Sequence, residues 1–99
     1  MTHELKILPQ YYCRVADGSK TFEMRVNDRG FQSGDTVILQ EWSDKPLNET
    51  TLEPLGYTGA PDLTFKIGYI LVLNSTEVVF SLLDARKAKE KATRGKVRK

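Results

Sequence analysis

The sequence Gly18-Ser19-Lys20-Thr21-Phe22-Glu23-Met24-Arg25-Val26 decides the predicted fold, because polar and apolar side chains alternate strictly along it from Thr21 onward. Such an alternation is typical of a β-strand that buries one face. We expect the apolar side chains to enter the core, namely Phe22, Met24 and Val26. The polar face then presents Glu23 beside Arg25, and Lys20 can swing toward that face from the preceding Gly-Ser turn. The rest of the chain is interpreted as the scaffold of this polar face.

The neighbouring segments predict four further strands and one helix. The strands are expected at residues 3–8, 36–42, 64–73 and 77–83, and the last two form an antiparallel hairpin. The helix starts at Pro9, runs to Asp17 and packs through Tyr12, Val15 and Ala16. These elements favour a mainly β (α+β) fold, a small antiparallel β-barrel with one helix after the first strand.

Two further expectations concern the core and the connections. Phe31, between two polar turns, is expected to anchor the core, and the strand at 64–73 is expected to keep a single apolar face. That face comprises Phe65, Ile67, Tyr69, Leu71 and Leu73. Residues 43–62 contain three prolines and two glycines, which predicts a long connection of a kind that is often functional.

Composition indicates one domain that does not enter a membrane. The 99 residues, 39% of them apolar, suffice for one domain with a modest core. No apolar run approaches the roughly 20 residues of a transmembrane helix, and the first residues lack the pattern of a signal peptide. We therefore expect a cytoplasmic protein, and the single Cys13 agrees with a reducing compartment.

Charge divides the chain into an acidic body and a basic tail. Residues 85–99 hold eight Lys/Arg and one acid, a net charge of +7, so residues 1–84 carry −5 of the overall +2. The tail cations are Arg86, Lys87, Lys89, Lys91, Arg94, Lys96, Arg98 and Lys99. We predict a domain at residues 1–84 and a disordered or frayed helical tail at 85–99, which could attract nucleic acid electrostatically.

The central stretch also carries a resemblance to a known family. Its pattern Gly18-x-Lys20-x-x-Glu23-x-Arg25 is similar to the G-x-K-x-x-E-x-R signature of ASCH domains, which belong to the PUA-like superfamily of small β-barrels. Flanking blocks agree in order: His3–Ile7, Asn27–Arg29, Phe31-Gln32, Gly34-Asp35, Glu41-Trp42 and Tyr57–Gly59. Together they resemble the ASCH-related family DUF3850, common in phages and prophages, over roughly residues 3 to 83. The resemblance implies a PUA-like barrel.

The resemblance also implies a ligand cleft between the helix and the barrel, lined by this motif. Lys20 and Arg25 would hold a phosphate or a base carbonyl, and Glu23 would accept a hydrogen bond from a base amino group. The predicted nucleic-acid site comprises Lys20, Thr21, Glu23, Arg25, Tyr57 and His3. In it Tyr57 would stack on a base and His3 would donate a hydrogen bond at the barrel rim. From the residues alone, Glu23 and Arg25 could equally form an exposed ion pair worth about 0–1 kcal/mol.

Three functions stay open at this point. The first is an RNA-binding module that recognises an unstacked nucleotide, the form that a small pocket accepts. The second is a small amidohydrolase acting on an acylated nucleoside, an activity of some ASCH proteins, with Lys20 and Glu23 as catalytic groups. Here Glu23 replaces that family's threonine, and a neighbouring carboxylate disfavours the neutral lysine that such chemistry needs. The third is a phage-encoded adaptor that contacts a host protein through residues 43–62.

No cofactor and no metal are expected. His3 is the only histidine and Cys13 the only cysteine, so the clusters that hold zinc are missing from the sequence.

Overall fold

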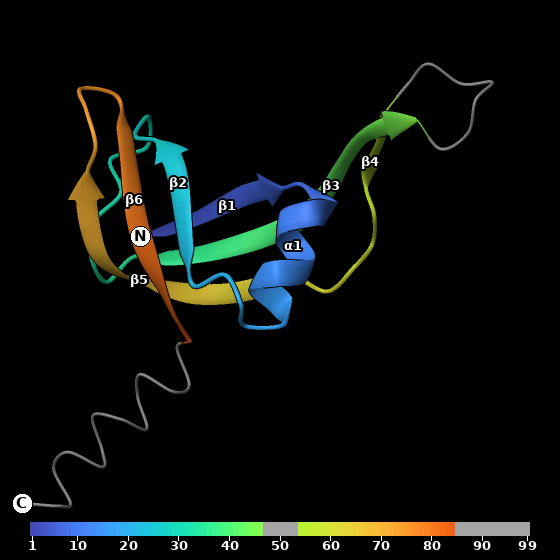
Figure 1. Cartoon of the computed structure of the whole chain (residues 1–99), viewed down its shortest axis with the longest axis horizontal. Coiled ribbons are helices and arrows are strands. Elements are labelled where there is room, and N and C mark those ends of the chain that lie inside the picture. Colours follow the sequence, from blue (N-terminus) through green and yellow to red (C-terminus); the bar gives the residue numbers. More distant parts are fainter. Residues whose placement is uncertain (47–53, 85–99) are drawn as a thin grey trace, which may run out of the picture.

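The computed structural model describes residues 1–46 and 54–84, which form one strand-rich body with a single short helix (Figure 1). The elements are β1 (Thr2–Ile7), α1 (Pro9–Ala16), β2 (Phe22–Val26), β3 (Thr36–Pro46), β4 (Pro54–Tyr57), β5 (Leu63–Val72) and β6 (Glu77–Asp84). The mainly β class with one helix after the first strand is therefore confirmed.

The strands form one sheet in the order β1-β3-β5-β6-β2, and β4 pairs with the far end of β3. The expected hairpin is confirmed, since β5 and β6 are antiparallel neighbours. The other pairs are antiparallel as well, except that β1 lies parallel to β3 with Leu5 opposite Leu39. The long connection between them, which contains α1 and β2, returns the chain to the end of the sheet where β1 began, as a parallel pair requires.

The sheet is open between its two edge strands, β1 and β2. Two arginine side chains cross this gap. The Nη2 atom of Arg25 donates to the Lys6 carbonyl over 2.7 Å, and Nη1 of Arg29 donates to the Glu4 carbonyl over 2.8 Å. Guanidinium groups thus satisfy carbonyls on the free edge of β1, where a closed barrel would have a backbone ladder. We call this boundary the β1–β2 seam; the closed barrel that the sequence predicted is not confirmed.

The core lies on the inner face of the curved sheet. Its buried members are Leu5, Ile7, Val15, Phe31, Val37, Leu39, Ile67, Val78, Phe80 and Leu82. Phe31 is 5% exposed, which confirms it as the anchor of the turn before β3. Helix α1 adds Val15 and part of Tyr12, whose hydroxyl donates to the Pro61 carbonyl over 2.6 Å. Ala16, expected to pack, is exposed.

Strand β5 does not keep the single apolar face that its sequence suggested. The register with β6 shifts between Ile67 and Ile70, so Ile67 is buried while Tyr69, 74% exposed, lies outside. The shift occurs at Gly68, where an added Cβ would collide with the Ser81 hydroxyl. That hydroxyl instead accepts a hydrogen bond from the Tyr69 amide over 2.8 Å. A glycine at a bulge thus moves the downstream side chains to the opposite face.

The long connection expected at residues 43–62 is in part regular structure. Strand β3 continues to Pro46 and pairs with β4, and Figure 1 shows both leaving the body as an arm. Residues 47–53 lie outside the described part of the chain, as does the expected tail at 85–99. Within the described ranges, no helix has the length and hydropathy needed to cross a bilayer.

Candidate functional site

A short turn after α1 places Lys20. The helix ends at Ala16 with Asp17 as its C-cap, and Gly18 follows with φ of +84°, a conformation that favours glycine. The Asp17 carboxylate accepts hydrogen bonds from the Ser19 amide and hydroxyl, over 2.8 and 2.6 Å. The Lys20 amide then donates to the Arg14 carbonyl over 2.9 Å. These bonds fold the turn back on the helix and aim the Lys20 side chain at β2.

Strand β2 presents its polar face to the interior, which reverses the expectation from its sequence. Glu23 is only 4% exposed. The apolar residues on the other face are largely in solvent, with Phe22 49%, Met24 57% and Val26 56% exposed. The alternation correctly predicted a strand, but the assignment of the apolar side to the core was wrong. The physical reason is the set of partners that Glu23 finds inside.

Glu23 is held between two cations. The Lys20 Nζ atom lies 2.5 Å from one carboxylate oxygen, and the Arg25 Nε atom lies 2.8 Å from the other. Lys20 also donates to the Phe22 carbonyl over 2.6 Å. Both cations are mostly covered, with side chains 18% and 25% exposed. A buried carboxylate is tolerated when it is neutralised and hydrogen-bonded in this way. We call Lys20, Glu23 and Arg25 the charged triad.

Lys6 connects the charged triad to the aromatic residues of the arm. Its carbonyl accepts the hydrogen bond from Arg25 across the seam. Its ammonium lies 5.0 Å from the centre of the Trp42 ring and 5.9 Å from that of Tyr57. These two rings face one another across β3 and β4. Among the described residues, the Lys6 ammonium has only these ring contacts and no hydrogen bond or ion pair.

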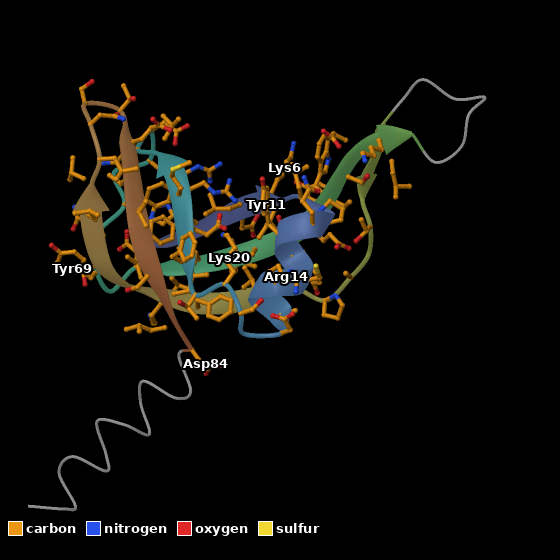
Figure 2. All side chains as sticks on the ribbon, in the orientation of Figure 1. Lys6, Tyr11, Arg14, Lys20, Tyr69 and Asp84 are labelled. Atoms are coloured by element: carbon orange, nitrogen blue, oxygen red, sulfur yellow. The ribbon has the colours of Figure 1, made fainter. Side chains whose placement is uncertain are left out.

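A second cation and aromatic group lies on the helix side of the triad. The Lys20 ammonium is 5.8 Å from the Tyr11 ring centre and 4.9 Å from that of Phe22. Figure 2 shows Lys6, Tyr11 and Lys20 in the region between α1 and β2. A continuous chain of contacts therefore runs from Tyr11 through the charged triad to Lys6 and Tyr57. We call this the cation–aromatic surface.

A cavity of about 340 Å³ opens along the same seam, toward the turn that precedes β3. Its inner wall is apolar and its sides carry charges of both signs. The lining includes Leu5, Phe31, Arg25, Arg29, Asp28 and Glu77. Arg25 is therefore a member of the charged triad and also lines the cavity.

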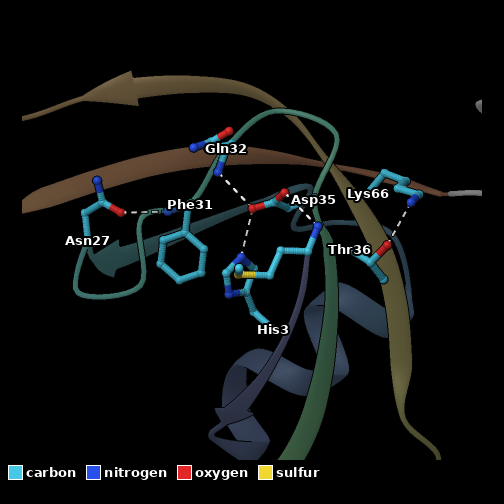
Figure 3. Close-up of polar contacts among 8 residues, drawn as sticks. His3, Asn27, Phe31, Gln32, Asp35, Thr36 and Lys66 are labelled. Carbon is cyan, nitrogen blue, oxygen red and sulfur yellow. Dashed lines mark hydrogen bonds and ion pairs between the residues drawn. The ribbon is translucent and has the colours of Figure 1, made fainter.

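His3, predicted to form a hydrogen bond, is buried and has its partner within the chain. Figure 3 shows it turned toward Asp35, with the two side chains in hydrogen-bond contact at 2.9 Å. Its ring also packs edge-on against Phe31, with centres 4.8 Å apart. The hydrogen bond from His3 lowers the pKa of Asp35 to about 2; burial opposes this, while the Gln32 amide and the chain's N-terminal ammonium add to it. His3 therefore fastens the start of β1 to the start of β3, away from Lys6 at the other end of β1.

The structure brings together some of the predicted site residues and separates others. Lys20, Glu23 and Arg25 are in direct contact. Among the described residues, Tyr57 joins them only through Lys6. The Thr21 side chain is exposed, while its carbonyl accepts a hydrogen bond from the Leu82 amide. The predicted tail cations lie outside the described residues. Sequence reasoning missed Lys6, because an isolated lysine in an alternating strand gives no local signal that it will meet aromatic rings from another element.

Comparison with known proteins places the chain in a family. The family model described as "Domain of unknown function (DUF3850)" matches residues 2–82. The chain belongs to the DUF3850 family. The part matched to DUF3850 includes all seven elements, apart from the last two residues of β6. The charged triad and Lys6 therefore lie within the DUF3850 domain.

A phage protein is also similar to part of this DUF3850 chain. It is the uncharacterised 12.9 kDa protein in the GpA 3′ region of Escherichia phage P2, 45% identical over 40 residues. The match covers 40% of this chain and 37% of the phage protein, so it spans little more than a third of that relative's length.

Proposed function

We propose that the chain binds single-stranded RNA on the cation–aromatic surface. The observation that carries the proposal is the Lys6 ammonium, which lies over the Trp42 and Tyr57 rings and has no polar partner among the described residues. Proteins that bind single strands combine cations, which hold phosphates, with aromatic rings on which bases stack. Lys6 and Tyr57 supply one such pair, and Lys20 with Tyr11 supplies a second.

The exposure of the two tyrosines supports a stacking role. The Tyr57 residue is 58% exposed and Tyr11 48% exposed, so each ring can receive a base. An unstacked base can reach them, whereas a base inside a duplex cannot. The charged triad would keep Lys20 and Arg25 in fixed positions between the two rings. Its net charge of one positive unit favours a phosphate at this point.

We also infer that the domain is an ASCH-type member of the PUA-like superfamily. Two features support this. The residues of the G-x-K-x-x-E-x-R signature meet one another at the β1–β2 seam. Moreover, Arg25 and Arg29 join the two edge strands that a PUA-like barrel would pair.

The amidohydrolase alternative gains no specific support from the geometry. The Lys20 ammonium donates to Glu23 and to the Phe22 carbonyl, so it is engaged in contacts within the domain. The adaptor alternative rests on residues 43–62, of which the structure describes only part. Both stay predictions.

The proposal is tested by fluorescence anisotropy with labelled single-stranded RNA of about 10 nucleotides, a length in the range of small single-strand sites. Tyr57→Ala should weaken binding by about 1–3 kcal/mol, because a stacking platform is removed. Tyr57→Phe keeps the ring and should bind like the wild type. Lys6→Ala should weaken binding, and Lys6→Arg should preserve it.

Two results would contradict the proposal. One is equal RNA affinity of Tyr57→Ala, Lys6→Ala and the wild-type chain. The other is equal affinity for single-stranded and duplex RNA of the same length. Circular dichroism of each variant confirms that a loss of affinity does not come from unfolding.

A further inference from the structure

The outer face of β2, β6 and β5 is apolar, and within the described part of the chain most of its side chains are exposed. The strand register places Met24 opposite Val79 and Val79 opposite Leu71, so one apolar row crosses all three strands. Met24 is 57% and Leu71 49% exposed. Five exposed apolar residues surround this row: Phe22, Val26, Tyr69, Leu73 and Leu83. We call these eight residues the outer apolar face.

The exposure of this face follows from the burial of Glu23. A shift of one residue in β2 would turn Phe22, Met24 and Val26 inward and Glu23 outward. The strand instead keeps Glu23 inside, bound to Lys20 and Arg25. The bulge at Gly68 acts in the same direction on β5, because it turns Tyr69 outward. Where a chain breaks the usual apolar-inward rule on adjacent strands, the exposed surface is expected to have a partner.

The outer apolar face gathers exposed apolar residues in one place, as a protein interface does. Seven of its eight residues are between 44% and 74% exposed, whereas apolar residues on the surface of a monomer are normally scattered singly. A standard interface covers about 800 Å² on each partner. The face would form the apolar centre of such a contact.

The charges at its two ends are complementary to a second copy of the same face. Glu77 lies opposite Val26 at one end, and Lys66 lies opposite Leu83 at the other. Among the described residues, the side chains of Glu77 and Lys66 have only neutral partners. Glu77 accepts a hydrogen bond from the Asn74 amide, and Lys66 donates one to the Thr36 hydroxyl (Figure 3). A two-fold axis that crosses the strands midway between Glu77 and Leu83, about one residue from the apolar row, would place Glu77 of each copy near Lys66 of the other. Such an isologous contact closes on itself.

We propose that the chain forms a homodimer through the outer apolar face, with the apolar rows packed together and Glu77 paired with Lys66 at both ends. The Lys6 and Tyr57 pair lies on β1 and the arm, off the outer apolar face, and stays free in both copies. Phe22 belongs to the outer apolar face although its ring lies 4.9 Å from the Lys20 ammonium, so the dimer covers the surface next to Lys20.

Sedimentation velocity of the full chain over a series of concentrations tests the dimer. At high concentration the sedimenting species should have about twice the 11.2 kDa mass of one chain. Met24→Lys and Leu71→Lys should each raise the dissociation constant at least tenfold, because each places a charge in the apolar centre. Leu55→Lys is the matched control, since Leu55 is 43% exposed in β4 and lies off the face; it should leave the dimer unchanged.

The arrangement of the two copies is tested by reversing the end charges. Glu77→Lys and Lys66→Glu should each weaken the dimer roughly tenfold, and the double variant should restore the wild-type dissociation constant. Melting temperatures near that of the wild type show that the variants fold. A wild-type chain that stays monomeric overturns the proposal. A dimer that tolerates Met24→Lys and Leu71→Lys also overturns it, and failure of the double variant to restore binding overturns the two-fold pairing.

Discussion

Glu23 has a structural role, because its carboxylate is engaged by neighbouring side chains. Its two carboxylate oxygens are occupied by Lys20 and Arg25, and its side chain is buried. The sequence predicted that these three residues would lie together, because their spacing brings a turn lysine and an alternate strand residue toward one carboxylate. It could not predict that the group faces inward. That outcome depends on the Lys6 carbonyl of β1, which accepts a hydrogen bond from the Arg25 side chain of β2, a strand distant in sequence.

Glu23→Gln should therefore destabilise the fold. The amide keeps the shape of the side chain but leaves two mostly covered cations without a neutralising charge, a change expected to cost about 2–4 kcal/mol. Urea denaturation measures it as a lower free energy of unfolding. The matched control is Glu4→Gln, because Glu4 is an exposed carboxylate on β1 and should change stability by less than about 0.5 kcal/mol. Equal stability of the two variants would contradict a structural role for Glu23.

Because the Asp35 carboxylate is stabilised in the folded state, the free energy of unfolding should decrease in acid. Its hydrogen bond with His3 lowers the carboxyl pKa from the ordinary 3.8 to about 2. Because the folded-state pKa is depressed, the stabilisation is fully present above about pH 4 and is lost as the pH falls toward 2. Asp35→Asn should be less stable than the wild type at pH 7, and the difference should narrow between pH 4 and pH 2. Thermal melts at several pH values, with exposed Asp44→Asn as control, check this; a difference that stays constant with pH would contradict it.

At the scale of elements, periodicity predicted where strands and the helix lie better than which way they face. The hairpin of β5 and β6 and the helix from Pro9 were predicted because apolar spacing, Pro and turn residues are local signals. The inward face of β2 and the shift within β5 were not, because each depends on partners from other strands. Gly68 gave a weak signal of its bulge, since a glycine inside a strand often marks one.

Gly68→Ala should lower the free energy of unfolding, because β5 and β6 pack closely at the bulge. The new methyl group would collide with the Ser81 hydroxyl and crowd the Leu83 side chain, whose nearest atoms lie 3.1 Å away. We expect a loss of about 1–3 kcal/mol, as for other overpacked sites. Ser81→Ala alone should cost less, because it removes only the hydrogen bond from the Tyr69 amide. Chemical denaturation of the double variant should give a loss smaller than the sum, because the methyl group no longer meets the hydroxyl. Strict additivity would contradict the contact.

At the scale of the whole molecule, the cation–aromatic surface joins residues from five segments. Tyr11 comes from α1, Lys20 from the following turn, Glu23 and Arg25 from β2, Lys6 from β1 and Tyr57 from β4. A pattern within one segment cannot predict such a surface; only the motif residues and Tyr57 were predicted. The same separation places a local group of cations on a body whose residues 1–84 carry a net −5. Binding of RNA would then depend on local geometry in the body and on general charge in residues 85–99.

These two contributions should differ in their response to salt. Replacement of the eight tail cations by glutamine should lower RNA affinity and flatten the dependence of log K on log salt, by about 0.7 for each phosphate that the tail no longer neutralises. Tyr57→Ala should lower affinity with little change in that slope, because stacking releases no counterions. Anisotropy titrations from about 50 to 200 mM salt separate the two effects. A tail variant with the wild-type slope would show that the tail does not bind the RNA. A tail variant without any binding, beside a Tyr57→Ala variant with full binding, would place the RNA on the tail alone and contradict the site on the body.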